Sequence, residues 1–365
     1  MARQDTRLMR ATRVGFSALI FLVVLAMFPL TQIPTGPIKI LLLALGAFLL
    51  TALYFIGGWL ADIPIQRPRL FLWILIAFLG LHIVSALASS YPWHSVEEVS
   101  RVAVLFLFYL VASQAFSTPG HVRPFLFMVC AATALATACA FAQYKGFDPF
   151  PWAYEEKWLY RMWPTTFGNP NYAGHVLVLC IIASLYLAAH WRWCWCILFV
   201  PPFLIHLYFA KYRAGAVALA ASLVFVLLAV GVRRWVKRPV LGVAATLVGT
   251  ATLWAGMLAG GVVLGQTGDW TRLRIEHSIV ARGNAYASAA RMIQERPLLG
   301  YGPGNYVIEN TGFWTPFQQR QFATRHVLDA HVHNDFLEVG AETGLPGAAL
   351  YIFLFLIAIC NGIYM

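Results

Sequence analysis

Long runs of apolar residues recur along this chain and are separated by short polar segments. A membrane core about 30 Å thick needs about 20 apolar residues of α-helix to cross it. Ten runs approach that length, at residues 14–31, 38–60, 70–88, 102–117, 124–142, 173–190, 193–210, 214–231, 240–265 and 346–364. The pattern predicts an all-α, polytopic helical membrane protein, with a kink where Pro201 and Pro202 interrupt the seventh span.

The spacing of these runs divides the chain into three parts. Residues 1–265 form a transmembrane domain with nine spans, residues 266–345 form one long loop, and residues 346–365 hold the last span. A connection as long as this loop usually carries function. The chain stops directly after the tenth span, without a basic anchor, so we expect the natural protein to continue beyond Met365.

Composition and charge support the membrane assignment. Apolar residues make up 60% of the chain and charged residues 11%, against about 25% charged residues in a typical soluble protein. If the N-terminus is cytoplasmic, the cytoplasmic segments carry 12 basic and two acidic residues, as the positive-inside rule requires. Topology then explains nearly all of the net charge of +11 and makes a nucleic-acid partner unnecessary.

Arg213 is a first candidate for binding an anionic group. It lies in the tight turn 211–215 between the seventh and eighth spans, on the outer side of this topology. A cation at a membrane boundary is often only an anchor that reaches for the interface. Arginine is scarce in short outer loops, however, so a headgroup-binding role is an equal alternative.

Arg282 is a second candidate. Residues 276–297 predict a helix, and a rotation of about 100° per residue places Arg282 on its apolar stripe with Ala289, while Arg291 lies on the polar side. A charge on a buried stripe requires a partner or a ligand, which favours Arg282 over Arg291. The glycine-rich segment 297–305 that follows lacks the lysine of a phosphate-binding loop and predicts a structural turn.

The densest polar cluster precedes the last span and comprises His326, Asp329, His331, His333, Asn334 and Asp335. Such a cluster could bind a divalent metal, or one neutral histidine could act as a general base. Asn334 is suited to cap a short helix that ends at Gly344, with Asp335, Glu338 and Glu342 on one face. This arrangement favours a base at His333, oriented by a carboxylate; a merely structural His333 is the alternative.

Several of these segments together resemble the O-antigen ligase and O-antigen polymerase superfamily over roughly residues 160–350. The strongest element is His333-Asn334, nine residues, and then Gly344-Leu-Pro-Gly347. The segment Phe167-Gly-Asn-Pro-Asn-Tyr172, Arg213-Ala-Gly215, and Arg282 ahead of a Pro-Leu-Leu-Gly-Tyr-Gly-Pro-Gly run also look like family features.

The resemblance implies a C-type membrane glycosyltransferase with about twelve spans and a large periplasmic loop, in the bacterial inner membrane. It implies an inverting reaction that needs no metal and no cofactor, with a glycan on undecaprenyl diphosphate as donor. By position, His333 is the expected base, Arg213 and Arg282 hold the diphosphate, and Asn334 and Glu342 support the site.

The acceptor is not fixed by these residues. The leading hypothesis is a ligase that joins the glycan to the lipid A–core oligosaccharide. A polysaccharide polymerase and a protein O-oligosaccharyltransferase share the same donor and chemistry and are the alternatives. A transporter of lipid-linked glycans and a zinc-dependent hydrolase are the competing classes, although the scarcity of charge within the spans argues against a transporter.

Overall fold

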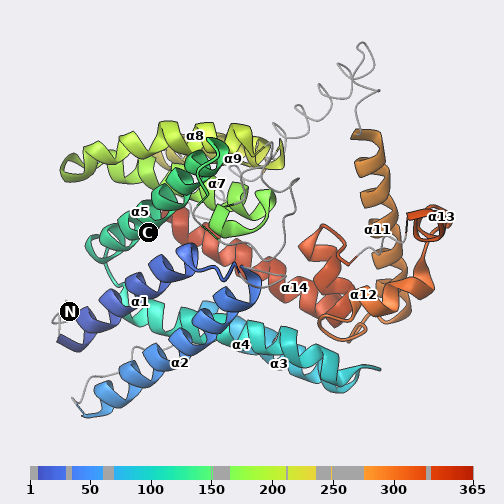
Figure 1. Cartoon of the computed structure of the whole chain (residues 1–365). Helices are drawn as coiled ribbons and strands as arrows, with labels where there is room; N and C mark the ends of the chain where they lie inside the picture. Colours follow the sequence, from blue (N-terminus) through green and yellow to red (C-terminus); the bar gives the residue numbers. More distant parts are fainter. Residues whose placement is uncertain are drawn as a thin grey trace. The chain divides into compact units, whose positions relative to one another are not determined.

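The computed structural model describes residues 7–29, 35–60, 70–148, 150, 165–210, 213–235, 248, 275–325 and 330–364 (Figure 1). Within these ranges the regular secondary structure is entirely helical. The prediction of an all-α membrane protein is therefore confirmed. The chain separates into two compact units, one containing residues 1–66 and 107–224 and the other containing residues 67–106 and 225–365.

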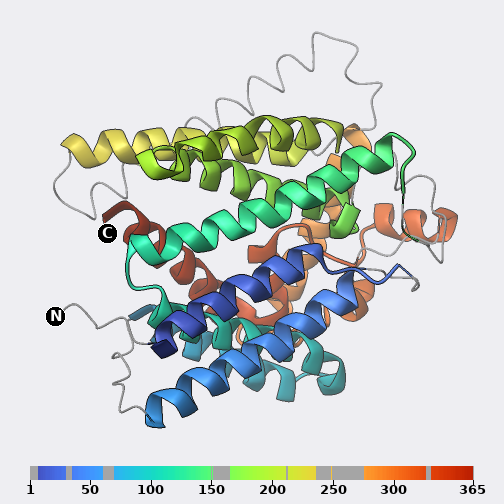
Figure 2. The ribbon, with the colours of Figure 1, turned by 60° about the vertical axis from the view of Figure 1, so that its left-hand side comes forward.

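The first unit holds the early helices and the middle of the chain. Its elements are α1 (Arg7–Leu25), α2 (Gly36–Leu60), α5 (Pro119–Tyr144), η1 (Thr165–Phe167), α7 (Pro170–Ala188), η2 (Trp191–Phe199), α8 (Val200–Phe209) and the first half of α9 (Arg213–Trp235). Helix α1 lies between α2 and α5, as Figure 2 shows. The ring of Phe16 on α1 packs edge-on against Phe125 on α5 and against Phe116 in the connection before α5, with centroids 5.7 and 5.5 Å away.

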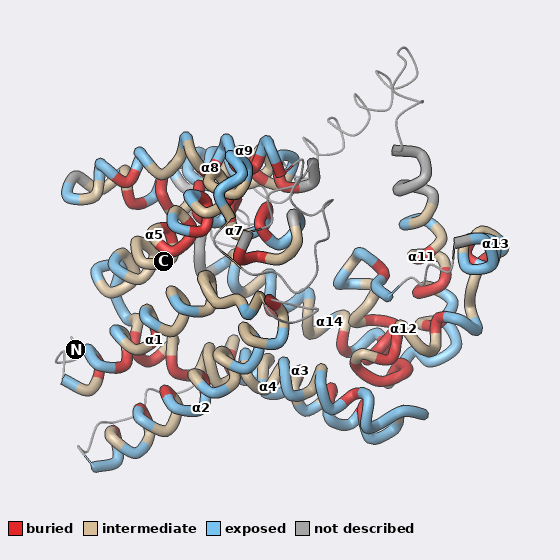
Figure 3. Tube along the Cα trace, viewed as in Figure 1, coloured by how far each residue is buried: buried red, intermediate tan, exposed pale blue. Residues whose placement is uncertain are grey.

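The second unit holds the C-terminal third of the chain together with one early helix. Its elements are α3 (Leu70–Leu87), α11 (Ile275–Glu295), α12 (Tyr306–Glu309), η4 (Asn310–Phe313), α13 (Pro316–Arg325) and α14 (Asp335–Tyr364). Helix α4 (Pro92–Ala115) begins in this unit and ends in the first. Helix α14 packs along α3 and against α11. Buried residues gather around α12 and the adjoining end of α11 (Figure 3).

Nine of the ten predicted spans fall on these helices, and the remaining one, the ninth (240–265), lies almost wholly outside the described residues. Seven described helices are long and apolar enough to cross a membrane. Helix α4 is not among them, and α9 contributes only the shorter apolar stretch Gly215–Gly231. Several helices begin well before the predicted apolar run, since a helix can continue beyond the membrane on polar residues.

The proline pair in the predicted seventh span starts a helix instead of kinking one. Residues 191–199 form the 3₁₀ helix η2, and α8 begins at Val200 with the prolines in its first turn. Proline is favoured in a first turn because its missing N–H would have no partner inside the helix. The regular helix is interrupted near Pro201 and Pro202, as predicted, but by a change from a 3₁₀ helix to an α-helix and not by a kink within one helix.

Candidate active site

The segment that carries the predicted motif is a helix broken at one glycine. The side chain of Asn334 caps its start by accepting hydrogen bonds from the backbone N–H groups of Phe336 (3.1 Å) and Leu337 (3.3 Å). The helix is interrupted at Gly344, where φ is 75° and ψ is −178°, and then continues as the membrane span. The predicted cap and the predicted end at Gly344 are both confirmed.

The glycine-rich turn 297–304 packs directly on this break. Leu345 N–H donates to Pro297 O (2.8 Å), and Gly302 N–H donates to Glu342 O (2.8 Å). A Cβ atom on Gly344 would lie 2.5 Å from the carbonyl carbon of Leu298, and one on Gly300 would lie 2.4 Å from that of Glu342. The turn is glycine-rich because two backbones meet here at a distance that leaves no room for side chains. It is a structural turn, as the sequence predicted.

Helices α3 and α4 also contact the glycine-rich turn through hydrogen bonds. The hydroxyl of Ser85 lies 2.6 Å from Leu299 O and 2.8 Å from Glu342 O, which joins α3 to the turn and to α14. At the start of α4, Nδ1 of His94 lies 2.9 Å from Oδ1 of Asn305. The buried side chain of Asn305 also donates from Nδ2 to Tyr301 O (3.0 Å). The second unit thus supports the motif from helices that are distant in sequence.

Glu342 is part of this support. Its side chain is only 8% exposed, and its Oε1 accepts a hydrogen bond from the backbone N–H of Tyr306 (3.2 Å). A buried carboxyl group needs such donors to offset its desolvation. Glu342 therefore joins the first turn of α12 to α14, and its role in the reaction stays a prediction.

His331 is the histidine that a carboxylate orients. Its Nδ1 lies 2.9 Å from Oε1 of Glu338, and Oε2 of Glu338 accepts a hydrogen bond from Val332 N–H (2.8 Å). The bond to Glu338 raises the pKa of the His331 imidazole above its usual value. A carboxylate bound to Nδ1 fixes the ring and leaves Nε2 for a ligand or a proton.

His333 has different surroundings. Its side chain is exposed, and its backbone has a φ of 59°, which is unusual for a residue other than glycine. We expected a carboxylate of the Asp335, Glu338 and Glu342 face to orient His333. Glu338 contacts His331 instead, because residues 331 and 332 run back along the first turns of α14. The role of His333 itself stays a prediction.

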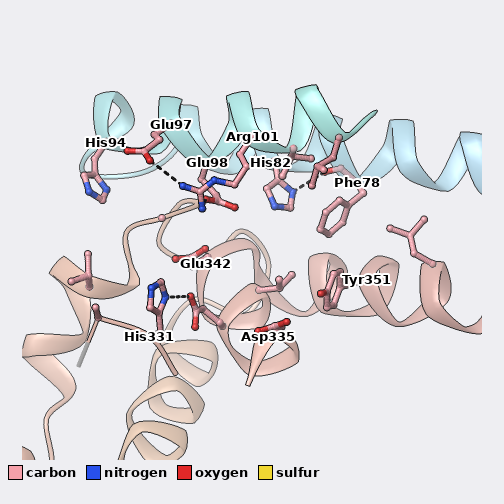
Figure 4. A pocket seen from close by; sticks show the side chains of 18 of the residues that line it. Phe78, His82, His94, Glu97, Glu98, Arg101, His331, Asp335, Glu342 and Tyr351 are labelled. Atoms are coloured by element: carbon pink, nitrogen blue, oxygen red, sulfur yellow. Dashed lines mark hydrogen bonds and ion pairs between the residues drawn. The ribbon is translucent and has the colours of Figure 1, made fainter. Parts of the chain in front are cut away.

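A cavity of about 560 Å³ lies in front of His331, between α3, α4 and α14. Figure 4 shows its labelled side chains entering from two sides, from α3 and α4 on one side and from α14 and the segment before it on the other. Its polar lining residues are His82, His94, Glu97, Glu98, Arg101, His331, Asp335, Glu338 and Glu342. Its apolar lining includes Leu75, Phe78, Val102, Leu105 and Leu354, with Tyr351 beside them. The three carboxylates predicted to share one face of α14 all line this cavity.

The charges of this cavity are mostly negative. Five carboxyl groups line it against one guanidinium group, that of Arg101, which pairs with Glu97 (3.0 Å) and Glu98 (2.8 Å). Burial raises the pKa of the Glu98 carboxyl, although Arg101 opposes this effect. Such a lining disfavours an anionic ligand and suits one that offers hydroxyl groups as hydrogen-bond donors. Within the described residues, no group of three or more His, Cys, Asp or Glu side chains has the geometry of a metal site.

The contribution of α4 was not predicted from the sequence. His94, Glu98 and Arg101 lie in the connection between the predicted spans 70–88 and 102–117 and were not among the candidate site residues. The signal was available, because the segment 97–101 (Glu-Glu-Val-Ser-Arg) is a dense group of charges next to an apolar run in a sequence with few charges.

The two predicted arginines, Arg213 and Arg282, are not among the described residues that line the cavity containing His331 and Glu342. Arg282 lies on α11 and is exposed, so its predicted place on a buried stripe is wrong. The buried face of α11 is formed by Ala285, Ser288, Ala289 and Met292, because Ser288 donates to Gln318 Oε1 (2.7 Å). Arg213 is the first residue of α9 and belongs to the first unit. The joint action of Arg213, Arg282 and His333 therefore stays a prediction.

Comparison with protein families identifies the class to which this site belongs. Residues 198–352 match the family model described as O-Antigen ligase. The matched region includes Arg213, Arg282, the glycine-rich turn and the whole broken-helix motif. The resemblance of this region to the O-antigen ligase superfamily, found in the sequence, is confirmed. No curated protein and no solved structure matches the chain.

Proposed function

We propose that this protein transfers a glycan from a lipid diphosphate to the hydroxyl group of an acceptor, with the lipid A–core oligosaccharide as the acceptor. The observation that carries the proposal is the His333-Asn334 and Gly344-x-x-Gly347 motif within an O-antigen ligase match. Its spacing corresponds to a capped helix, a break at Gly344 and a membrane span. The family match supports glycosyl transfer as the class of reaction.

In this proposal the donor is a glycan on undecaprenyl diphosphate, and Arg213 and Arg282 hold its diphosphate. Guanidinium groups bind phosphate oxygens through paired hydrogen bonds. Arg282 is exposed and available to a ligand. Arg213 stands at the first turn of α9, where the helix dipole adds to the attraction for an anion. The two cations stabilise the charge that develops on the departing diphosphate.

The cavity beside His331 receives sugar in this proposal. Its excess of carboxylates would repel a diphosphate, whereas carboxylate oxygens accept hydrogen bonds from sugar hydroxyl groups. Its apolar end, which includes Phe78 and Leu354, lies on helices long enough to span a membrane. We therefore place sugar rings at its polar end and the diphosphate of the donor outside this cavity.

His333 acts as the general base. Its imidazole takes the proton of the acceptor hydroxyl while that oxygen attacks the anomeric carbon of the donor glycan. The bond from that carbon to the diphosphate oxygen breaks, and the lipid diphosphate leaves with the electron pair, so the configuration inverts. The diphosphate needs positive charge more than a proton to leave, and the reaction requires no metal. We place the protein in the inner membrane, with its N-terminus in the cytoplasm and its active site on the periplasmic side.

The test is transfer by the purified full chain in detergent, with undecaprenyl-diphosphate-linked glycan, lipid A–core and EDTA. His333→Ala should abolish transfer, and replacement of His190, a half-buried histidine of the first unit, by alanine should leave transfer as in the wild type. His331→Ala, measured in parallel, separates the two neighbouring imidazoles.

Each outcome has a defined meaning. Full activity in His333→Ala combined with none in His331→Ala would move the base to His331. Wild-type activity that disappears in EDTA would contradict the metal-free mechanism. Lengthening of the carrier-linked glycan without transfer to lipid A–core would make the protein a polymerase. No reaction of the donor with any hydroxyl acceptor would overturn glycosyl transfer.

A further inference from the structure

A second cavity, of about 520 Å³, lies in the first unit where α1 and α5 begin. Its lining contains three basic side chains, those of Arg10, Arg13 and His121, and no carboxylate. Apart from Ser17 and Gly120, the other lining residues are apolar. This composition is the opposite of the carboxylate-rich cavity beside His331, so the two cavities suit different ligands.

The helices fix the basic groups in place. Arg10 and Arg13 are three residues apart on α1 and therefore lie on the same side of the helix, one turn apart. Nη1 of Arg13 donates a hydrogen bond to Ala115 O (3.2 Å), which holds its side chain against the end of α4. His121 stands in the first turn of α5, which packs along α1. The basic groups thus come from two elements that support each other.

The cavity follows the polarity of a membrane boundary. Both α1 and α5 are candidate spans, and the lining residues on them lie between the fourth and twelfth residues of α1 and between the second and tenth residues of α5. The basic groups lie near the helix starts, whereas Ala18 and Met128 lie about two turns further along the two helices. A phospholipid has the same order of parts, with a phosphate at the boundary and acyl chains toward the hydrocarbon core.

We propose that this cavity binds an anionic phospholipid. Arg10 and Arg13 bind the phosphate, His121 donates to it, and the acyl chain lies along Phe125 and Met128. Basic pockets between transmembrane helices are suited to acidic lipid headgroups, and arginine forms paired hydrogen bonds with phosphate. This site is independent of the glycan-transfer site and of the proposed function.

The experiment measures thermal unfolding of the purified full chain in neutral detergent during titration with dioleoyl phosphatidylglycerol. Dioleoyl phosphatidylcholine and inorganic phosphate are titrated in parallel. Arg10→Gln removes one cation. Gly120→Glu adds a carboxylate at a position where a Cβ meets only Thr118 Oγ1, at 3.7 Å. Arg7→Gln is the matched control, because Arg7 is also an exposed arginine at the start of α1 but does not line the cavity.

We expect phosphatidylglycerol to raise the unfolding temperature saturably and phosphatidylcholine to have little effect. Arg10→Gln should weaken the apparent affinity about fivefold, the size expected for one basic side chain at an acidic membrane surface. Gly120→Glu should weaken it at least as much, and Arg7→Gln should leave it unchanged. Equal effects of both lipids, unchanged affinity in Arg10→Gln and Gly120→Glu, or full protection by inorganic phosphate alone would each overturn the proposal.

Discussion

Replacing Gly344 by alanine tests whether the broken helix is a requirement of the fold. The φ of 75° and ψ of −178° at this residue belong to a region that only glycine enters readily, and another residue there costs about 1–3 kcal/mol. The added methyl carbon would also lie 2.5 Å from Leu298 C and O and 2.7 Å from Pro297 O. These are backbone atoms, which cannot rotate away as a side chain can.

The two effects act together, because relieving the clash requires moving the turn that donates and accepts the surrounding hydrogen bonds. We therefore expect a loss at the upper end of the strain range, about 3 kcal/mol or more. Domains are typically stable by about 5–15 kcal/mol, so the loss is a large part of the total. Gly344→Ala should unfold at a clearly lower temperature in detergent and lose transfer activity.

The control is Gly283→Ala, the same chemical change on α11 at a position where a Cβ meets nothing within 4 Å. Thermal unfolding of both variants, followed by intrinsic tryptophan fluorescence, compares them directly. If Gly344→Ala unfolds at the wild-type temperature and keeps its activity, the break is not under the constraint described here. If both variants lose stability equally, the effect is not specific to the break.

Three further predictions concern single interactions. Gly283→Ala should stabilise the protein by about 0.5–1 kcal/mol, because alanine is the better residue in a helix interior; its unfolding temperature should rise. Asn169→Ala should cost about 0.5–2 kcal/mol, since the Asn169 side chain caps α7 by accepting from Asn171 N–H (2.8 Å); the unfolding temperature checks this, and an unchanged value would contradict the cap. The raised pKa of His331 means that its contribution to stability is complete below the unfolded value near 6.5 and disappears as the pH rises through the folded value. Glu338→Gln should lower that pKa toward its usual value, as measured by NMR titration of the imidazole; an unchanged titration would contradict the pairing.

The features predicted correctly from the sequence are those that local chemistry determines. Asn334, the nine-residue spacing and Gly344 together specified a capped helix with a glycine end. These signals act within a few residues, and an asparagine before a helix or a glycine at its end has few other structural roles. The helical membrane class followed in the same way, because apolar run length is a property of one segment at a time.

The features missed depend on which segments pack together. Arg282 was placed on a buried stripe because it shares one side of the helix with the apolar residue Ala289, but the actual partners of α11 include α13 and η4. The contacts of Ser288 with η4 and α13 lie in the second half of α11, so Ala289 is buried while Arg282, in the first half of the helix, is exposed. A helical wheel cannot show this difference, since it contains no information about how far along the helix the neighbouring elements reach.

The choice of histidine partner failed for a similar reason. The carboxylate face of α14 was correct, but the path of the chain before the cap was not predictable. The positive φ at His333 changes the direction of the backbone, so that His331 reaches Glu338. The contributions of Ser85 and His94 are more distant still, because more than 200 residues separate them from their partners.

The length of the nine-residue spacer between Asn334 and Gly344 determines how far the helix rotates between these two residues. Nine residues of α-helix make two and a half turns, and each residue adds about 100°. The glycine-rich turn is hydrogen-bonded to the C-terminal end of this spacer, because Gly302 N–H donates to Glu342 O and Leu345 N–H, just after Gly344, donates to Pro297 O. One inserted or deleted residue would therefore keep the charge, the hydropathy and almost the whole length of the helix, but would swing Glu338 away from the cavity. The length of the spacer thus sets the rotation of the histidine segment relative to the membrane span.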